Sequence, residues 1–361
     1  MIHIETLSQD WILSVKAKIA RSDPGILERL LRAYYLTEQL VEHGLEFVFK
    51  GGTCLTLLTQ QPRRFSTDVD VITGMGKDEI ESVLDKICSS SSFTRYELDV
   101  RRSYQSEIPK AHYFLFFVSA IDGKEISILL DLLFEENEYS STQETPIVNE
   151  YIKLDGGAST VLTPTINAIM GDKLTAFAPN TTGILYGTRK DLEIVKQLFD
   201  LDILFDEMDD FGEVVKSFNA CVKNELQYRS ALSATKEDVL MDMISTAELI
   251  AKRNSQDSAS DNDKFAEIQN GLKRFNYYTI NRPFRIEQAI VASAKVAVVA
   301  AKILKGDHTP LLRVPNGVQR SDYLIPFEIT RYAYLNRKLR SVATDAQFYW
   351  HTALKILDEL E

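Results

Sequence analysis

Two short groups of residues between positions 50 and 70 combine side-chain types that suit phosphate and metal chemistry. Gly51, Gly52 and Thr53 follow an apolar segment, and Asp68 and Asp70 begin fifteen residues after the threonine. Side chains two positions apart on a strand share a face, so the two carboxylates would be directed at one point. A divalent cation is the usual reason to tolerate that repulsion. A glycine-rich turn beside them would offer backbone N–H groups to phosphate. The spacing therefore predicts nucleotide chemistry at a metal site.

A third carboxylate, Asp131, stands inside the apolar segment 126–134. An unpaired carboxylate is costly to bury. If this segment is the strand next to that of Asp68 and Asp70, the three carboxylates would hold two Mg²⁺ ions, or Mn²⁺ in their place. Two metals clamp the attacking and leaving oxygens of a phosphoryl displacement. The alternative is that Asp131 lies at the end of its strand and is solvated.

The elements that must position these residues change along the chain. Helical periodicity predicts helices within residues 8–43, at 53–59 and at 77–88, and further helices after Thr163-Pro164 and from Arg189. Short strands are expected at 46–49, 69–72, 94–101, 112–120 and 125–134, with Asp122-Gly123 as a hairpin turn. Strand signals fade after residue 206. We therefore expect an α+β domain, with a mixed sheet flanked by helices, over residues 1–206, and an all-helical domain over 207–361.

Composition limits the class of protein. The chain has 361 residues, 45% of them hydrophobic and 26% charged, with a net charge of −11. This charge argues against a surface that binds nucleic acid everywhere, but it leaves room for a local basic groove. Its three cysteines are widely spaced, so neither a disulfide framework nor a zinc site is predicted. A reducing cytoplasm is the expected location, and no apolar run is long enough to predict a membrane partner.

Two runs of the chain carry a family resemblance. KGGTCL at 50–55 and RFSTDVD at 64–70 together resemble the AbiEii/AbiGii-type toxins, a branch of the DNA polymerase β-like nucleotidyltransferase superfamily that also holds the MenT toxins. The family carries a lysine on a later helix and a basic and acidic pair beyond it. This chain has Lys173, Arg189 and Asp191 at those places. The motifs cover about residues 46 to 205.

The resemblance implies roles for individual residues. Gly51, Gly52, Thr53, Arg64 and Ser66 would bind the nucleotide, with Arg64 holding the Asp68 loop or touching phosphate. For Ser66, modification as a form of control and a simple turn hydrogen bond both remain open.

The metal-binding and charged residues have implied roles as well. Asp68 and Asp70 would bind the metals, and Lys173 would neutralise the triphosphate as a point charge. Asp191 would orient Lys173 or Arg189, or assist the acceptor hydroxyl.

The activity implied is transfer of a nucleoside monophosphate from an NTP to an acceptor hydroxyl with Mg²⁺. The acceptor expected from the resemblance is an RNA 3′ end such as that of a tRNA. The biological role implied is a toxin of a toxin–antitoxin or phage-defence system, restrained by a cognate antitoxin protein. Two alternatives remain: transfer to a protein hydroxyl, as in AMPylation, and a non-catalytic binding module on the same fold.

Two basic and aromatic segments, 271–285 and 329–344, contain no acidic residue. Basic side chains neutralise phosphates, and aromatic rings stack on unpaired bases. The alternative is that the aromatics are helix core and the basic residues are a solvated face. The candidate RNA-binding residues are Lys273, Arg274, Arg282, Arg285, Arg337 and Lys338.

Overall fold

The structure is a computed structural model that describes residues 1–19, 23–59, 62–101, 103, 109–229, 233–255, 257–326 and 331–358. It contains two compact units. The first comprises Met1–Thr165 with Tyr277–Pro283, and the second comprises Ile166–Asn276 with Phe284–Glu361. This division differs from the boundary expected between residues 206 and 207. The helices immediately after residue 165 pack against later helices, so they belong to the helical unit.

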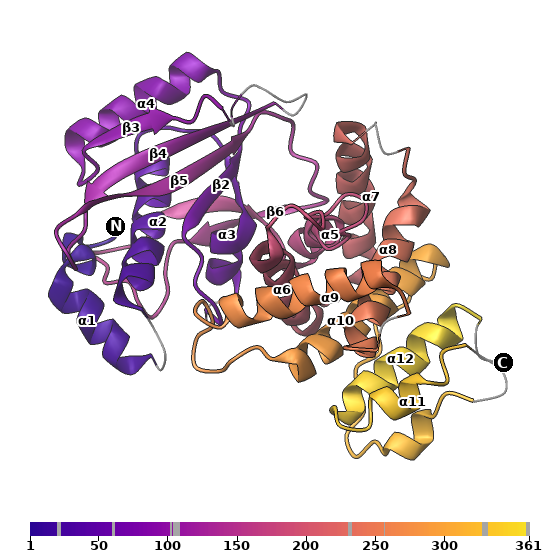
Figure 1. The fold of residues 1–361 in the computed structure, drawn as a ribbon. Coiled ribbons are helices and arrows are strands. Elements are labelled where there is room, and N and C mark those ends of the chain that lie inside the picture. Colours follow the sequence, from indigo (N-terminus) through magenta and orange to yellow (C-terminus); the bar gives the residue numbers. More distant parts are fainter. Residues whose placement is uncertain are drawn as a thin grey trace. The chain divides into compact units, whose positions relative to one another are not determined.

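The first unit is an α+β structure, as expected: helices precede and separate its first strands, and its last five strands follow one another in the chain (Figure 1). In chain order its elements are η1 (Ile4–Leu7), α1 (Gln9–Lys18), α2 (Pro24–Glu42), β1 (Val48–Lys50), α3 (Gly51–Leu58), β2 (Asp68–Ile72), α4 (Lys77–Ser90), β3 (Arg95–Leu98), β4 (Lys110–Val118), β5 (Glu125–Leu133), β6 (Thr142–Pro146) and β7 (Thr160–Pro164).

Five of these strands form one mixed sheet in the order β1-β2-β5-β4-β3. Strands β2 and β5 are parallel, and the other neighbours are antiparallel. The hairpin between β4 and β5 turns at Gly123, whose φ of 72° is readily adopted only by a residue without a Cβ. The strand of Asp131 lies directly beside the strand of Asp68 and Asp70, which is the arrangement required for the three carboxylates to meet.

The two faces of the sheet differ in polarity. Val69, Val71, Leu130 and Leu132 alternate along β2 and β5 and are buried on one face. That face carries Tyr113, whose hydroxyl donates to Glu81 of α4 at 3.1 Å. The residues between these apolar positions point to the other face, where β2 presents two half-buried carboxylates. Period-two alternation therefore separates the core from the candidate site.

The strands β6 and β7 form a separate two-stranded antiparallel sheet that the sequence did not predict. Thr163-Pro164 was expected to open a helix, but Pro164 ends β7 and the next helix begins at Ile166. The pair is held partly by a hydrogen bond between the hydroxyls of Thr145 and Thr163 at 2.7 Å. Because β6 reads Thr-Gln-Glu-Thr-Pro, it lacks the apolar alternation by which a strand is predicted.

The second unit is helical, with no strand among its described residues. Its elements are α5 (Ile166–Ala176), α6 (Asp191–Glu207), α7 (Phe211–Tyr228), α8 (Lys236–Lys252), α9 (Ala259–Phe275), α10 (Ile286–Leu304), η3 (Arg320–Tyr323), α11 (Leu335–Lys338) and α12 (Thr344–Ile356). The alanine-rich α10 is buried along most of its length and packs against α6, α8 and α12. Within the described ranges, no helix has both the length and the apolar character needed to cross a membrane.

Candidate functional site

A row of charged and polar residues crosses the more polar face of the large sheet. Lys50 on β1 is the partner of Asp70 on β2, and Asp70 is the partner of Asp131 on β5. Asp131 is in turn the partner of His112 on β4. Residues paired across neighbouring strands present their side chains to the same face. Asp68 lies two positions before Asp70 and shares that face, so the sheet gathers three carboxylates on it.

The turn between β1 and α3 lies directly against Asp70. Gly51 has a φ of +77°, and a Cβ built on it would lie 1.9 Å from Oδ2 of Asp70. No other residue type fits this position without displacing the carboxylate. Gly51 is also the first residue of α3, so the free N–H groups of that helix begin beside Asp70. This brings the turn predicted to bind phosphate next to a carboxylate predicted to bind metal.

Gly52 makes a second close approach, to two other predicted nucleotide-binding residues. A Cβ built on it would lie 2.3 Å from Nη2 of Arg64 and 2.7 Å from Oγ of Ser66. Arg64 is buried and donates from Nη1 to the carbonyl of Phe65 at 3.0 Å. The buried Thr53 donates its hydroxyl to the carbonyl of Asp68 at 2.5 Å. In this structure Thr53 therefore fixes the Asp68 backbone.

Asp131 is engaged by a residue that sequence reasoning did not single out. The ring of His112 lies within hydrogen-bond contact of the Asp131 carboxylate, and the His112 side chain is only 8% exposed. Only the strand register brings these two residues together, so neither motif nor spacing could have identified the pair. Among the described residues, no three or more His, Cys, Asp or Glu side chains form a group that could hold a metal ion. The third-ligand role of Asp131 stays a prediction.

The loop of Arg64 is fixed by a segment more than 200 residues later in the chain. Arg64 forms an isolated antiparallel bridge with Thr279. Beside it, Phe65 N–H donates to the carbonyl of Tyr278 at 2.8 Å, and Ile280 N–H donates to that of Arg63 at 2.9 Å. This segment was expected only as part of a basic and aromatic island. Its pairing with the Arg64 loop had no signal in the sequence.

Lys173, expected to neutralise the triphosphate, lies in the second unit and is buried there. Its ammonium lies 3.0 Å from Oδ2 of Asp200 and donates to Oε1 of Gln197 at 3.1 Å, both on α6. Asp200 is fully buried, so this ion pair is part of the helical core. Removing one partner of such a pair would leave an uncompensated buried charge.

Asp191 is the first residue of α6, where the helix dipole stabilises a negative charge. Its carboxylate accepts a hydrogen bond from Nη1 of Arg274 on α9 at 2.6 Å. The two helices meet closely here, since a Cβ on Gly271 would lie 2.3 Å from the Asp191 carbonyl. The expected contact of Asp191 with Lys173 is absent from the described contacts, which pair Lys173 with Asp200. A predicted catalytic residue and a predicted RNA-binding residue therefore form one ion pair.

Three of the six aromatic residues in the two basic segments are core residues. Phe275 and Phe284 are buried and pack edge-to-face on Phe199 at 5.0 and 5.1 Å. Tyr332 is buried and stacks on Trp350. The alternative considered from the sequence is correct for these three rings. Tyr277 differs from them, because it is 73% exposed.

The basic residues of these segments are divided between the two units. Arg282 belongs to the first unit, whereas Lys273, Arg274 and Arg285 belong to the second. Lys273, Arg282 and Arg285 are exposed to solvent. The segment 271–285 therefore contributes to both units.

Arg337 and Lys338 line a cavity of about 650 Å³ in the second unit. Its other lining residues are Glu248, Lys252, Ser255, Asp257, Arg331 and Tyr334. Lys252 pairs with both carboxylates of this set, at 3.1 and 2.6 Å. Burial lowers the pKa of Lys338, and the nearby positive charges of Arg337 and Arg253 lower it further. The cavity therefore has more positive than negative charge, which suits an anionic group.

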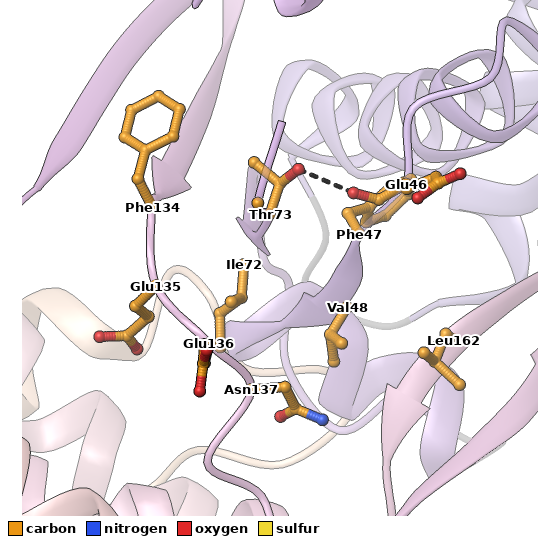
Figure 2. Close-up of a pocket in the computed structure, with 11 residues that line it drawn as sticks. Glu46, Phe47, Val48, Ile72, Thr73, Phe134, Glu135, Glu136, Asn137 and Leu162 are labelled. Atoms are coloured by element: carbon orange, nitrogen blue, oxygen red, sulfur yellow. Dashed lines mark hydrogen bonds between the residues drawn. The ribbon is translucent and has the colours of Figure 1, made fainter. Parts of the chain in front are cut away.

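A cavity in the first unit, of about 570 Å³, is unsuited to a triphosphate. Figure 2 shows its lining side chains, which come from the segments around β1 and β2, from the chain after β5 and, with Leu162, from β7. The hydroxyl of Thr73 donates to the carbonyl of Glu46 at 2.7 Å on one wall. Three glutamates line it, Glu46, Glu135 and Glu136, and none of the predicted site residues does. The carboxylates would repel a polyanion.

Comparisons with known proteins identify the family. The sequence profile described as "Nucleotidyl transferase AbiEii toxin, Type IV TA system" matches residues 34–285, which is more than half of the chain. No curated protein matches this chain significantly.

Two solved structures resemble the chain at low sequence identity. JHP933 from Helicobacter pylori is 16% identical with a TM-score of 0.45, over 79% of this chain and 94% of that one. An antigenic nucleotidyltransferase-like protein from Paracoccidioides brasiliensis is 14% identical with a TM-score of 0.37, over 57% and 90%. The profile match extends over both glycines, all three sheet carboxylates and the Arg64 loop. The chain therefore belongs to the AbiEii family of nucleotidyltransferase toxins of type IV toxin–antitoxin systems.

Proposed function

We propose that this toxin transfers a nucleoside monophosphate from an NTP to the 3′ hydroxyl of an RNA, with tRNA as the expected acceptor. The observation that carries the proposal is the contact of Gly51 with Asp70, where a Cβ would lie 1.9 Å from the carboxylate. It brings the first N–H groups of α3 next to the carboxylate face of the sheet. Family membership supports the reaction class, and the acceptor and the metal are part of the proposal.

The residues present fit a Mg²⁺ ion whose coordination shell is completed by phosphate oxygens of the substrate. Mg²⁺ is commonly held by one or two carboxylates together with substrate phosphates, rather than by a full set of protein ligands. Asp68 and Asp70 share one half-buried face, which suits that arrangement. When bound, Mg²⁺ would neutralise charge on the triphosphate and on the departing pyrophosphate.

In the proposed reaction, the acceptor oxygen bonds to the α-phosphorus while the bond between that phosphorus and the bridging oxygen breaks. Pyrophosphate leaves, and the hydroxyl proton is lost to solvent. The chain's own contribution is positioning and charge. The N-terminal N–H groups of α3 and the guanidinium of Arg64 would hold phosphate oxygens. Thr53 fixes the backbone at Asp68 and so maintains the position of the carboxylates.

The test is incubation of the full chain with total tRNA, Mg²⁺ and each of the four labelled NTPs in turn. Wild type should label RNA, and Asp70→Ala should not. Asp78→Ala is the matched control, because Asp78 is an exposed carboxylate on α4, which packs on the opposite face of the sheet. Label on protein instead of RNA would favour AMPylation. If wild type labels nothing with any of the four NTPs, just as Asp70→Ala does, the proposed transfer is wrong.

A cellular experiment separates catalysis from simple binding. Expression of the catalytic form should inhibit growth, and Asp68→Ala should relieve that inhibition. Equal inhibition by wild type and by Asp68→Ala would instead support a non-catalytic binding module.

A further inference from the structure

The loop Tyr277–Pro283 connects two helices of the second unit but packs within the first. Its base is closed by a hydrogen bond from Phe284 N–H to Oδ1 of Asn276 at 2.9 Å. Its middle is fixed by the bridge between Thr279 and Arg64. Thr279 and Ile280 are buried, at 1% and 6% exposure, so packing as well as pairing holds the loop in place.

The pairing brings the loop of Tyr277 to the Arg64 segment. Tyr278 lies opposite Phe65, because its carbonyl accepts from the Phe65 N–H. In an antiparallel pairing the next positions outward are Tyr277 and Ser66, at the same end. Tyr277 lies in the turn before this pairing, next in the chain to Tyr278. The Arg64 segment also adjoins α3, since Arg64 and Ser66 both come close to Gly52. The loop of Tyr277 is therefore joined, through the Arg64 segment, to the turn expected to hold phosphates.

Tyr277 is exposed, although the middle of its loop and the residues on both sides of the loop are packed. Its side chain is 73% exposed, while the flanking rings of Phe275 and Phe284 are buried at 0% and 3%. Exposed apolar residues are common when they occur singly. This one lies on a loop that pairs with the Arg64 segment, and Arg64 adjoins the turn expected to hold phosphates. Its exposed neighbour Arg282 adds a positive charge to the same loop.

We propose that Tyr277 is a stacking platform for a nucleobase at this site. The inference rests on the proposed function, and it adds a base-contacting residue from outside the two sequence motifs. A tyrosine ring contacts any base through its π-face, so this contact would strengthen binding without selecting one base. The base belongs either to the incoming NTP or to the end of the acceptor RNA, and the ligands in the test distinguish these sources.

The test measures binding by the full chain to three ligands in Mg²⁺: a non-hydrolysable NTP, tRNA and inorganic tripolyphosphate. Tyr277→Ala should weaken binding of the NTP or of the tRNA by roughly 5- to 150-fold, the range of one base stacking on one ring. A loss confined to the NTP assigns the base to the substrate, and a loss confined to tRNA assigns it to the acceptor. Tripolyphosphate has no base, so its affinity should not change.

Tyr277→Phe is the matched control, because it keeps the ring and removes only the hydroxyl. It should bind all three ligands as wild type does. The inference is overturned if Tyr277→Ala binds NTP and tRNA like wild type, if the phenylalanine variant loses as much as the alanine variant, or if tripolyphosphate binding falls in parallel. If wild type itself binds neither NTP nor tRNA, the proposed function fails, and this inference with it.

Discussion

The contact between Gly51 and Asp70 predicts a large and specific effect of Gly51→Ala. The glycine has a φ of +77°, and the added Cβ would lie 1.9 Å from Oδ2 and 2.8 Å from Cβ of Asp70. Left-handed backbone costs a residue with a Cβ about 1–2 kcal/mol. Overpacking of this kind adds roughly 1–3 kcal/mol. The Asp70 carboxylate would turn away to relieve the overlap, so binding of Mg²⁺ with NTP should fall together with stability.

Gly44→Ala is the matched control for backbone strain alone. Gly44 has a φ of +84°, and a Cβ built on it would have no atom within 4 Å. The free energy of unfolding of the Gly44→Ala variant should fall only by the strain cost of about 1–2 kcal/mol. Urea unfolding measures both stability losses, and titration calorimetry measures binding of Mg²⁺ with a non-hydrolysable NTP. Gly44→Ala should bind as wild type does.

A double-mutant cycle with Asp70→Gly isolates the contact. Removing the Asp70 side chain removes the atoms that the new Cβ would meet, so the double variant should be more stable than the sum of the single effects implies. If Gly51→Ala and Gly44→Ala lose the same stability and both keep wild-type binding, the close approach of this turn to Asp70 is refuted.

Three further predictions concern other charged residues. Lys173→Met should lower the free energy of unfolding, measured in urea, by about 3–5 kcal/mol, because it leaves the buried Asp200 carboxylate without the Lys173 ammonium. A change below 1 kcal/mol would contradict this. Replacing Arg337 and Lys338 together with glutamine should flatten the slope of log Kobs against log salt for tRNA binding by roughly 1–2, measured by filter binding, and an unchanged slope would argue against phosphate contacts. Hydrogen bonds from Lys302 and from the Thr309 hydroxyl lower the pKa of Asp307 to about 2. Asp307→Asn should therefore destabilise the fold near neutral pH. The difference from wild type should shrink as the pH falls from about 4 towards 2, where the folded carboxylate gains its proton; equal urea midpoint differences at pH 7 and pH 3 would contradict it.

Local sequence determined much of the first unit because its signals act over a few residues. Ser8 and Asp23 cap α1 and α2, both within the range 8–43 predicted to be helical, and Gly123 turns the predicted hairpin. Alternation along a strand directed Asp68 and Asp70 to one face, since the period of two is a property of the extended backbone. The motif residues were therefore identifiable before the fold was known. The family followed from the same two motifs.

Tertiary structure decided the contacts that depend on distant segments. Strand register placed Asp131 beside Asp70 and brought His112 to Asp131, and register depends on how whole strands pack. Helix packing put Lys173 and Asp191 into ion pairs of the helical unit and moved the unit boundary to residue 165. The pairing of Thr279 with Arg64 joins residues more than 200 positions apart. Backbone hydrogen bonds of that kind are available to any residue type, so they leave no pattern in the sequence.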